Sequence, residues 1–352
     1  MRETLKDHLA AWANAHPARE EVAVAVLAAA EAGRKLAELC ALGPLTGDLA
    51  AGCGANAGGD TQKELDRRAH ELFVAALRHT QVAVLGSEEA ETPITMRAGG
   101  RLAMALDPLD GSSNIATNAP LGSIFSLLPA HPDLPPERQL LRPGSEQIAA
   151  GFMVYGPETA LVLTLGAGVD VFTLHRPSGV FLLTRKALRI PNGTAEFAIN
   201  VSNYRFWEAP VRAYVDDCMA GADGPRRVDF NMRWLASVVA EAYRILFRGG
   251  IYLYPGDARP GYREGRLRLV YEAAPLAFLM QEAGGAATDG THPILSLAPT
   301  HLHQRIPLIF GAHDKVARVR AYYAGELAIA ERSPLFGRRG LFRGERELAP
   351  CR

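Results

Sequence analysis

Three short apolar runs of this chain lead into acidic residues, and this pattern constrains the fold more than any other feature. The runs and the acids that follow them are 82–85 with Glu88 and Glu89, 102–106 with Asp107, and 267–271 with Glu272. Short apolar runs bounded by turn residues are typical of strands buried inside a sheet. The sequence therefore predicts strands that carry carboxylates at their ends, which is an arrangement suited to holding cations.

Helical and strand patterns alternate along the 352 residues. Ala and Leu recur at helical spacing over 20–42 and 62–79, whereas 123–183 contains short strand-like runs separated by turns, as in an antiparallel sheet. After residue 197 helices and strands alternate again, which predicts a second α/β lobe. The predicted units are an N-terminal lobe over 1–192 with the acids and a phosphate loop, a C-terminal lobe over 193–334 and a mobile basic tail over 335–352.

The charge balance argues against a surface that binds polyanions. The 38 Lys and Arg residues equal the 38 Asp and Glu residues, so any phosphate must be recognised at a local site and no nucleic-acid partner is expected. The 4 cysteines form no CxxC pair, and acidic residues near the N-terminus are untypical of a targeting peptide. We expect a cytoplasmic protein without a membrane partner.

The most specific motif is the octet 107–114, which reads DPLDGSSN and follows the apolar run 102–106. Pro108 lacks an N–H donor and is expected to end the strand. Asp107 and Asp110 would then lie on either side of the resulting turn. Carboxylates that converge beside free N–H groups can hold a hard cation and a phosphate together.

The second half of the octet supplies the N–H groups. Gly111 lets the backbone of Ser112 and Ser113 approach an anion closely and donate to it. The alternative is an ordinary Asx turn that caps a helix, because Asp, Gly and Ser are all common turn residues. The complete octet after an apolar strand favours the phosphate and metal interpretation.

Carboxylates without His or Cys beside them suit Mg²⁺, or Mn²⁺ as a substitute, better than Zn²⁺. Such ions bind phosphoryl oxygens, lower the pKa of a bound water and neutralise the leaving alkoxide, so the acids indicate a metal-dependent phosphatase. Asp66 begins the helix that follows the loop 43–60 and is available to orient or deprotonate the attacking water, with Glu89 as its neighbour.

The chain resembles class 1 fructose-1,6-bisphosphatases, within the larger lithium-sensitive group of metal-dependent sugar-phosphate phosphatases. The segments that carry the resemblance are 87–89, 107–114, 122–125, 149–152, 249–255, 267–272 and 283–288. The resemblance implies a layered αβαβα sandwich. It also implies Mg²⁺-dependent removal of the 1-phosphate from fructose 1,6-bisphosphate, giving fructose 6-phosphate, in gluconeogenesis or the Calvin cycle.

The resemblance also implies roles for individual residues. The implied metal ligands are Glu88, Glu89, Asp107, Asp110, Glu272 and the carbonyl of Leu109. The implied water-activating acids are Asp60 and Asp66, together with Glu89, and the implied reacting-phosphate site contains Asp110, Gly111, Ser112 and Ser113. The implied sugar and 6-phosphate contacts are Asn200, Tyr254 and Arg266, with Arg233 reaching the 6-phosphate of a neighbouring subunit. A homo-oligomer, either a dimer or a tetramer, is therefore expected.

Two departures from the family pattern leave the identity of the substrate sugar undecided. Arg266 stands where the family usually has Lys, and Trp234 stands where it usually has Tyr. A sedoheptulose-1,7-bisphosphatase or an enzyme of dual specificity is therefore an alternative.

Two further alternatives concern the chemistry. A phosphatase with Asp107 as covalent nucleophile would need a DxD spacing, whereas this chain has DxxD followed by two serines. A non-catalytic protein that binds metal or sugar phosphate is disfavoured by the complete set of water-activating acids, Asp60, Asp66 and Glu89.

Overall fold

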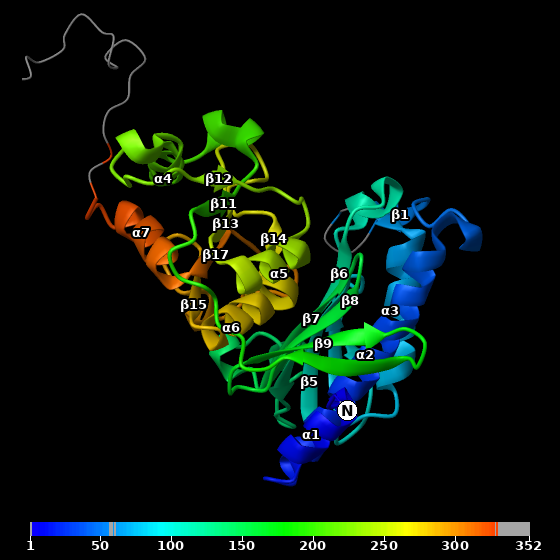
Figure 1. Ribbon diagram of the computed structural model, residues 1–352. Coiled ribbons are helices and arrows are strands. Elements are labelled where there is room, and N and C mark those ends of the chain that lie inside the picture. Colours follow the sequence, from blue (N-terminus) through cyan, green and yellow to red (C-terminus); the bar gives the residue numbers. More distant parts are fainter. Residues whose placement is uncertain (1, 56–58, 60, 328, 330–352) are drawn as a thin grey trace, which may run out of the picture.

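The computed structural model describes residues 2–55, 59, 61–327 and 329, and helices and sheets alternate in layers through it (Figure 1). Asp60 and the predicted tail 335–352 lie outside these described residues. The largest element is an eight-stranded sheet in the order β10-β9-β8-β7-β6-β5-β3-β4. Its strands are β3 Val82–Ser87, β4 Ile94–Thr95, β5 Leu102–Asp110, β6 Leu121–Pro129, β7 Ala149–Tyr155, β8 Thr159–Thr164, β9 Val169–His175 and β10 Val180–Arg185.

Only β3 and β5 run parallel in this sheet, so the antiparallel arrangement predicted for 123–183 is confirmed. Every residue of β5 and of β7 is buried, because helices cover both faces of the sheet. Side chains alternate between the faces: Met104 and Met153 pack on one side, and Phe152 packs on the other.

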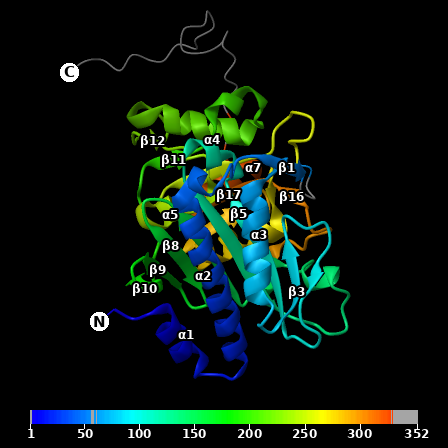
Figure 2. The same cartoon turned by 90° about the vertical axis from the view of Figure 1, so that its right-hand side faces the viewer.

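Three helices cover the first face: α1 Leu5–Ala13, α2 Ala18–Leu42 and α3 Glu64–Leu77. Figure 2 shows α2 and α3 lying side by side across the sheet. Helix α2 has Glu20 and Glu21 in its first turn and ends at Gly43, whose N–H donates to the Leu39 carbonyl. Its Ala-rich inner face allows close packing on the strands.

The opposite face packs on α5 Val238–Arg248 and α6 Ala274–Glu282, which separate it from a second sheet (Figure 1). That five-stranded sheet has the order β12-β11-β13-β17-β15. Its strands are β11 Glu196–Ala198, β12 Asn231–Met232, β13 Ile251–Tyr254, β15 Gly285–Thr288 and β17 Leu308–Ala312. Helices α4 Ala209–Met219 and α7 His313–Tyr323 cover its outer face. The αβαβα order implied by the resemblance is therefore confirmed.

Two small sheets complete the fold: β1 Gly52–Ala55 with β2 Thr61–Lys63, and β14 Leu267–Arg268 with β16 Arg305–Ile306. Among the described helices, none combines the length and the apolar character needed to cross a bilayer.

The predicted end of the second acidic strand is wrong. Strand β5 continues through Pro108 to Asp110. The register of β5 against β6 shifts between Asp107 and Asp110, so a bulge accommodates the residue that lacks an N–H donor. Both aspartates consequently lie on the strand rather than on either side of a turn.

The strand predicted over 267–271 is also wrong. Only Leu267–Arg268 is a strand, and Leu269–Ala273 forms a buried π-helical turn that runs directly into α6. A short apolar run cannot be assigned to strand or buried helix from its periodicity alone. Glu272 therefore projects from a widened helical turn, and Pro275 occupies the first turn of α6, where its missing N–H costs no hydrogen bond.

The contact of α1 with the sheet generates a pH-dependent prediction. His8 Nε2 lies 3.1 Å from Asp170 Oδ2, and Nδ1 lies 3.2 Å from Glu3 Oε1. The hydrogen bond to Asp170 raises the pKa of His8 above its ordinary value of 6.5, against the lowering effect of burial. This stabilisation is therefore complete below pH 6.5 and is lost as pH rises through the folded-state pKa.

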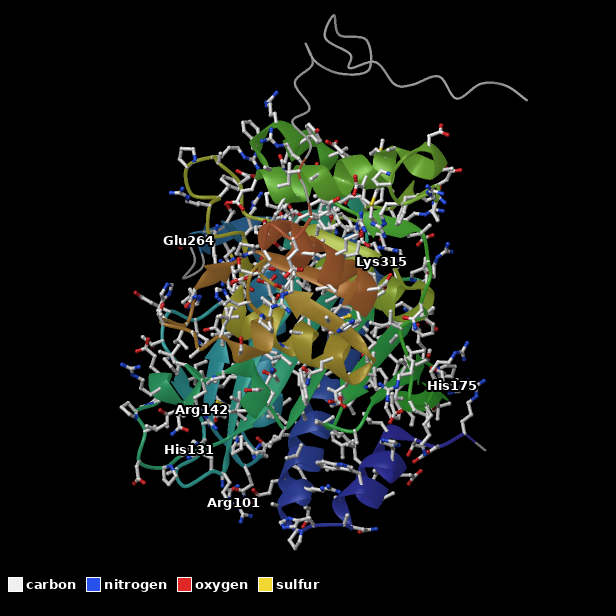
Figure 3. The ribbon with its side chains drawn as sticks, turned by 90° about the vertical axis from the view of Figure 1, so that its left-hand side faces the viewer. Arg101, His131, Arg142, His175, Glu264 and Lys315 are labelled. Carbon is white, nitrogen blue, oxygen red and sulfur yellow. The ribbon has the colours of Figure 1, made fainter. Side chains whose placement is uncertain are left out.

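We expect His8→Gln to lower the free energy of unfolding by about 1 kcal/mol near pH 5.5, and by much less near pH 8.5. Denaturant unfolding at both pH values measures this difference. His175→Gln is the control, because His175 is exposed at the end of β9, the strand that contains Asp170 (Figure 3). This control should give an equal, small change in unfolding free energy at both pH values. A His8 deficit that does not change with pH would contradict the assignment.

Candidate active site

Three of the predicted metal ligands lie together in the interior. Carboxylate oxygens of Asp107, Asp110 and Glu272 all lie within 4.8 Å of one another, and the three residues are buried. The bulge in β5 lets the side chains of Asp107 and Asp110 approach each other, and the π-helical turn before α6 brings Glu272 to them. The structure thus joins acids that are far apart in the sequence.

The cluster is electrostatically strained in the absence of a cation. Burial raises the pKa of Asp107 well above its ordinary value, and the charges of Glu88 and Glu272 raise it further. Burial and the Glu88 charge also raise the pKa of Glu272, although Arg268 opposes this rise. Buried carboxylates of this kind become stable anions only when positive charge or hydrogen-bond donors approach them.

Asp110 has donors of its own. Its Oδ2 accepts hydrogen bonds of 3.3 Å from the Ser237 hydroxyl and from the Val239 N–H at the start of α5. Burial raises the pKa of Asp110 to about 6, while these donors lower it. The carboxylate therefore also joins the end of β5, inside the first sheet, to the middle helix layer.

The two glutamates after β3 lie beside this three-carboxylate group rather than inside it. Glu88 Oε1 lies 3.4 Å from Arg268 Nη1, and its charge acts on both Asp107 and Glu272. Glu89 Oε2 accepts a 2.5 Å hydrogen bond from Gln62 Nε2. The Leu109 N–H donates to Asp107 Oδ1 at 3.0 Å, so the predicted Leu109 ligand adjoins the cluster through its backbone.

Asp66 has an unpartnered carboxylate oxygen. It occupies the third position of α3, where Oδ2 accepts the Lys63 N–H at 2.7 Å in a capping box. The side chain is 2% exposed, and Oδ1 has no hydrogen-bond partner among the described residues. Burial raises the pKa of Asp66 to about 7, the Lys63 N–H lowers it and the Glu89 charge raises it. Asp66 can therefore take up or release a proton near neutral pH.

The loop predicted to bind the reacting phosphate follows β5 directly. Gly111 adopts φ 84°, a left-handed conformation that favours glycine, and Ser112–Thr117 forms a 3₁₀ turn. Lys63 Nζ donates to the Ser112 carbonyl at 2.7 Å, which ties this loop to the start of α3. Ser113 is exposed and Ser112 is partly buried, so the loop is accessible from solvent.

A second site lies in the C-terminal lobe. Asn200, Tyr254 and Arg266, which the resemblance assigns to the sugar and its 6-phosphate, line a single pocket. We call it the distal pocket. The loop that supplies Arg266 also contains Glu264, which Figure 3 labels at the edge of the molecule.

The residues of the distal pocket that sequence reasoning missed include Arg259 and Tyr262. The guanidinium groups of Arg259 and Arg266 lie 4.4 Å and 4.8 Å from the centroid of the Tyr262 ring. Arg259 Nε also donates to Asp257 Oδ1 at 2.9 Å. These residues belong to a loop without periodicity, so no sequence pattern identifies them.

Arg233 lies apart from the distal pocket. Its side chain is 52% exposed, and Nε lies 3.6 Å from Glu196 Oε1. It is not among the residues that line the pocket. Its predicted contact with a neighbouring subunit stays a prediction, and Asp60 lies outside the described residues.

Comparisons with known proteins agree with this fold and site. A family model described as the fructose-1,6-bisphosphatase N-terminal domain matches residues 25–186, and the corresponding C-terminal domain matches residues 190–324. A class 1 fructose-1,6-bisphosphatase of Azorhizobium caulinodans is 55% identical over 326 residues, covering 91% of this chain and 99% of that protein. A class 1 fructose-1,6-bisphosphatase of Methylorubrum extorquens is 50% identical, covering 97% of this chain and 98% of that protein.

A solved structure is also similar. The crystal structure of Leishmania major fructose-1,6-bisphosphatase in holo form aligns with a TM-score of 0.85 and 34% sequence identity, covering 92% of this chain and 99% of that one. The layered fold, the buried carboxylates and these similarities lead to one conclusion: the chain belongs to the class 1 fructose-1,6-bisphosphatase family.

Proposed function

We propose that this protein hydrolyses the 1-phosphate of fructose 1,6-bisphosphate by direct attack of water, with Mg²⁺ as the resident cation and Mn²⁺ as a substitute. The observation that carries the proposal is the buried cluster of Asp107, Asp110 and Glu272 beside the octet loop. A phosphate-release assay with and without Mg²⁺ tests it.

The donor set fits a hard divalent cation. The cluster contains only carboxylates, with Glu88 and Glu89 next to it and no His or Cys in the group. We assign Glu88, Glu89, Asp107, Asp110, Glu272 and the Leu109 carbonyl as the residues that would hold the ions. Bound there, such ions neutralise charge on the phosphoryl oxygens and lower the pKa of water.

The protein's own residues perform the remaining tasks. The unpartnered Oδ1 of Asp66 accepts a proton from the attacking water, and Gln62 holds Glu89 beside it. Asp60 is assigned to the same task by its position in the sequence. The backbone N–H groups of Ser112 and Ser113 bind the reacting phosphate after Gly111.

The distal pocket binds the 6-phosphate. The Arg266 guanidinium packs on the Tyr262 ring and is the charge that would bind the phosphate dianion, while Arg259 packs on the same ring and is paired with Asp257. Asn200 and Tyr254 supply the polar groups for the sugar. Assays of fructose and sedoheptulose bisphosphates side by side determine the sugar preference. Oligomeric state, the lobe boundary at 192 and cytoplasmic location stay predictions.

The strain in the carboxylate cluster predicts the behaviour of Asp107→Asn. Removing one of three buried like charges should raise the melting temperature of the metal-free protein by about 2 °C. The further rise that Mg²⁺ gives the wild type should be lost. Asp217→Asn is the control, because this buried carboxylate pairs with Arg318 in the outer layer and should leave the Mg²⁺ effect intact. An undiminished Mg²⁺ effect in Asp107→Asn would remove this residue from the ligand set.

The position of Asp66 predicts a loss of turnover without a loss of metal. Asp66→Asn keeps an acceptor for the Lys63 N–H but cannot take a proton, so kcat should fall about 10²-fold. Calorimetric titration should give unchanged Mn²⁺ affinity. Glu71→Gln removes an exposed charge from the same helix and should have normal kcat. Near-normal turnover of Asp66→Asn would exclude its role in water activation.

The distal pocket predicts a binding defect in Arg266→Ala. Because the distal phosphate binds away from the reacting centre, KM for fructose 1,6-bisphosphate should rise about tenfold or more, with little change in kcat. Arg263→Ala serves as the control, since Arg263 is exposed on the same loop and does not line the pocket. If KM is unchanged in Arg266→Ala, the distal phosphate binds elsewhere.

A further inference from the structure

The segment 233–237, between β12 and α5, connects the two halves of the candidate site. At one end the Arg233 N–H donates to the Phe197 carbonyl at 2.8 Å. At the other end Ser237 begins α5, and its hydroxyl lies 3.3 Å from Asp110 Oδ2. The Ser237 end is thus held at the carboxylate cluster, whereas the Arg233 end is held at the second sheet.

The segment is held in a strained conformation. Ala236 has φ 53°, in the left-handed region that residues with a Cβ rarely adopt. Its carbonyl accepts a 3.2 Å hydrogen bond from Asn114 Nδ2 of the octet loop. Strain of this kind persists only where surrounding contacts over-determine the conformation.

A buried carboxylate supplies the central contact. Glu241, in the first turn of α5, is 0% exposed, and its Oε1 accepts the Leu235 N–H at 2.7 Å. Its Oε2 accepts a 2.9 Å hydrogen bond from Arg244 Nε, and Arg244 Nη1 reaches Glu196 Oε2 at 2.9 Å. Glu241 thus fixes the middle of the segment to the helix and to the second sheet at once.

The segment also forms part of the support of the distal pocket. The Trp234 ring stacks on Tyr252 with centroids 5.8 Å apart and planes inclined by 4°. It contacts Tyr254, with centroids 6.0 Å apart, and Tyr254 lines the distal pocket. The position of Trp234 therefore sets where the Tyr254 ring can lie.

We propose that Glu241 is a positioning residue for distal-phosphate binding: its carboxylate, braced by Arg244, fixes the segment 233–237 and so the Trp234–Tyr254 contact. This inference rests on the proposed function. A buried ion pair contributes little net stability compared with apolar replacements, so an orienting role accounts for a charge at this place.

The test measures the two phosphate sites separately in Glu241→Gln. Fructose 6-phosphate carries only the distal phosphate, and inorganic phosphate represents the reacting one. We expect KM for fructose 1,6-bisphosphate and Ki for fructose 6-phosphate to rise about tenfold. Ki for inorganic phosphate and kcat should stay within about twofold of wild type. A merely structural defect would change both inhibition constants.

Two further variants keep the test decisive. Arg244→Lys retains the charge but can brace only one of the two carboxylates, so it should fold and show a smaller shift in the same direction. Asp217→Asn removes a buried, paired carboxylate of the same lobe and should leave the ratio of the two Ki values unchanged.

Three outcomes overturn the positioning role. The first is an unchanged Ki for fructose 6-phosphate in both Glu241→Gln and Arg244→Lys, and the second is an equal rise of both inhibition constants in Glu241→Gln. The third is that Asp217→Asn changes the ratio of the two Ki values as much as Glu241→Gln does. A wild-type protein that releases no phosphate from fructose 1,6-bisphosphate would instead contradict the proposed function.

Discussion

Repulsion among the buried carboxylates of Asp107, Asp110 and Glu272 is the interaction around which the other contacts of the site are arranged. At 4.8 Å and an effective dielectric constant of about 20, two full charges repel by on the order of 3 kcal/mol. Each carboxylate is met by a backbone N–H, donated by Leu109, Val239 and Arg268 respectively. These donors orient the oxygens and leave a need for positive charge, which a divalent cation meets.

Hydrogen bonds also join the first sheet and its octet loop to the start of α5. Asp110 belongs to the first sheet but takes its hydrogen bonds from α5, and Asn114 of the octet loop holds the Ala236 carbonyl in the segment before α5. The octet loop and the segment before α5 are therefore hydrogen-bonded to each other. If the two proposed phosphate sites lie on these elements, contacts of this kind help to keep the separation that a bisphosphate needs.

The sequence was sufficient for features that depend on burial and turn chemistry. Strands buried on both faces, such as β5 and β7, give apolar runs, and the glycine of the octet marks the turn that follows β5. The sequence was insufficient where contacts with neighbouring elements determine the backbone conformation. The bulge at Pro108 and the π-helical turn Leu269–Ala273 depend on neighbouring strands and on α6. The distal-pocket residue Arg259 lies in a loop without periodicity, so only tertiary contacts show its place. Helix α1 does carry a local signal, because Thr4 caps its first turn and exchanges hydrogen bonds with Asp7.

The start of α5 donates hydrogen bonds to Asp110 and thereby distinguishes it from the other acids of the cluster. A helix N-terminus stabilises a negative charge through its free N–H groups and its dipole. Here the Val239 N–H is given to Asp110, so this helix end stabilises a protein carboxylate rather than a substrate phosphate. These donors lower the pKa of Asp110, which burial raises to about 6, whereas burial and the neighbouring charges of Glu88 and Glu272 both raise the pKa of Asp107. Asp110 is therefore the acid of the cluster whose charge α5 stabilises, and the charges of Asp107 and Glu272 depend more on a bound cation.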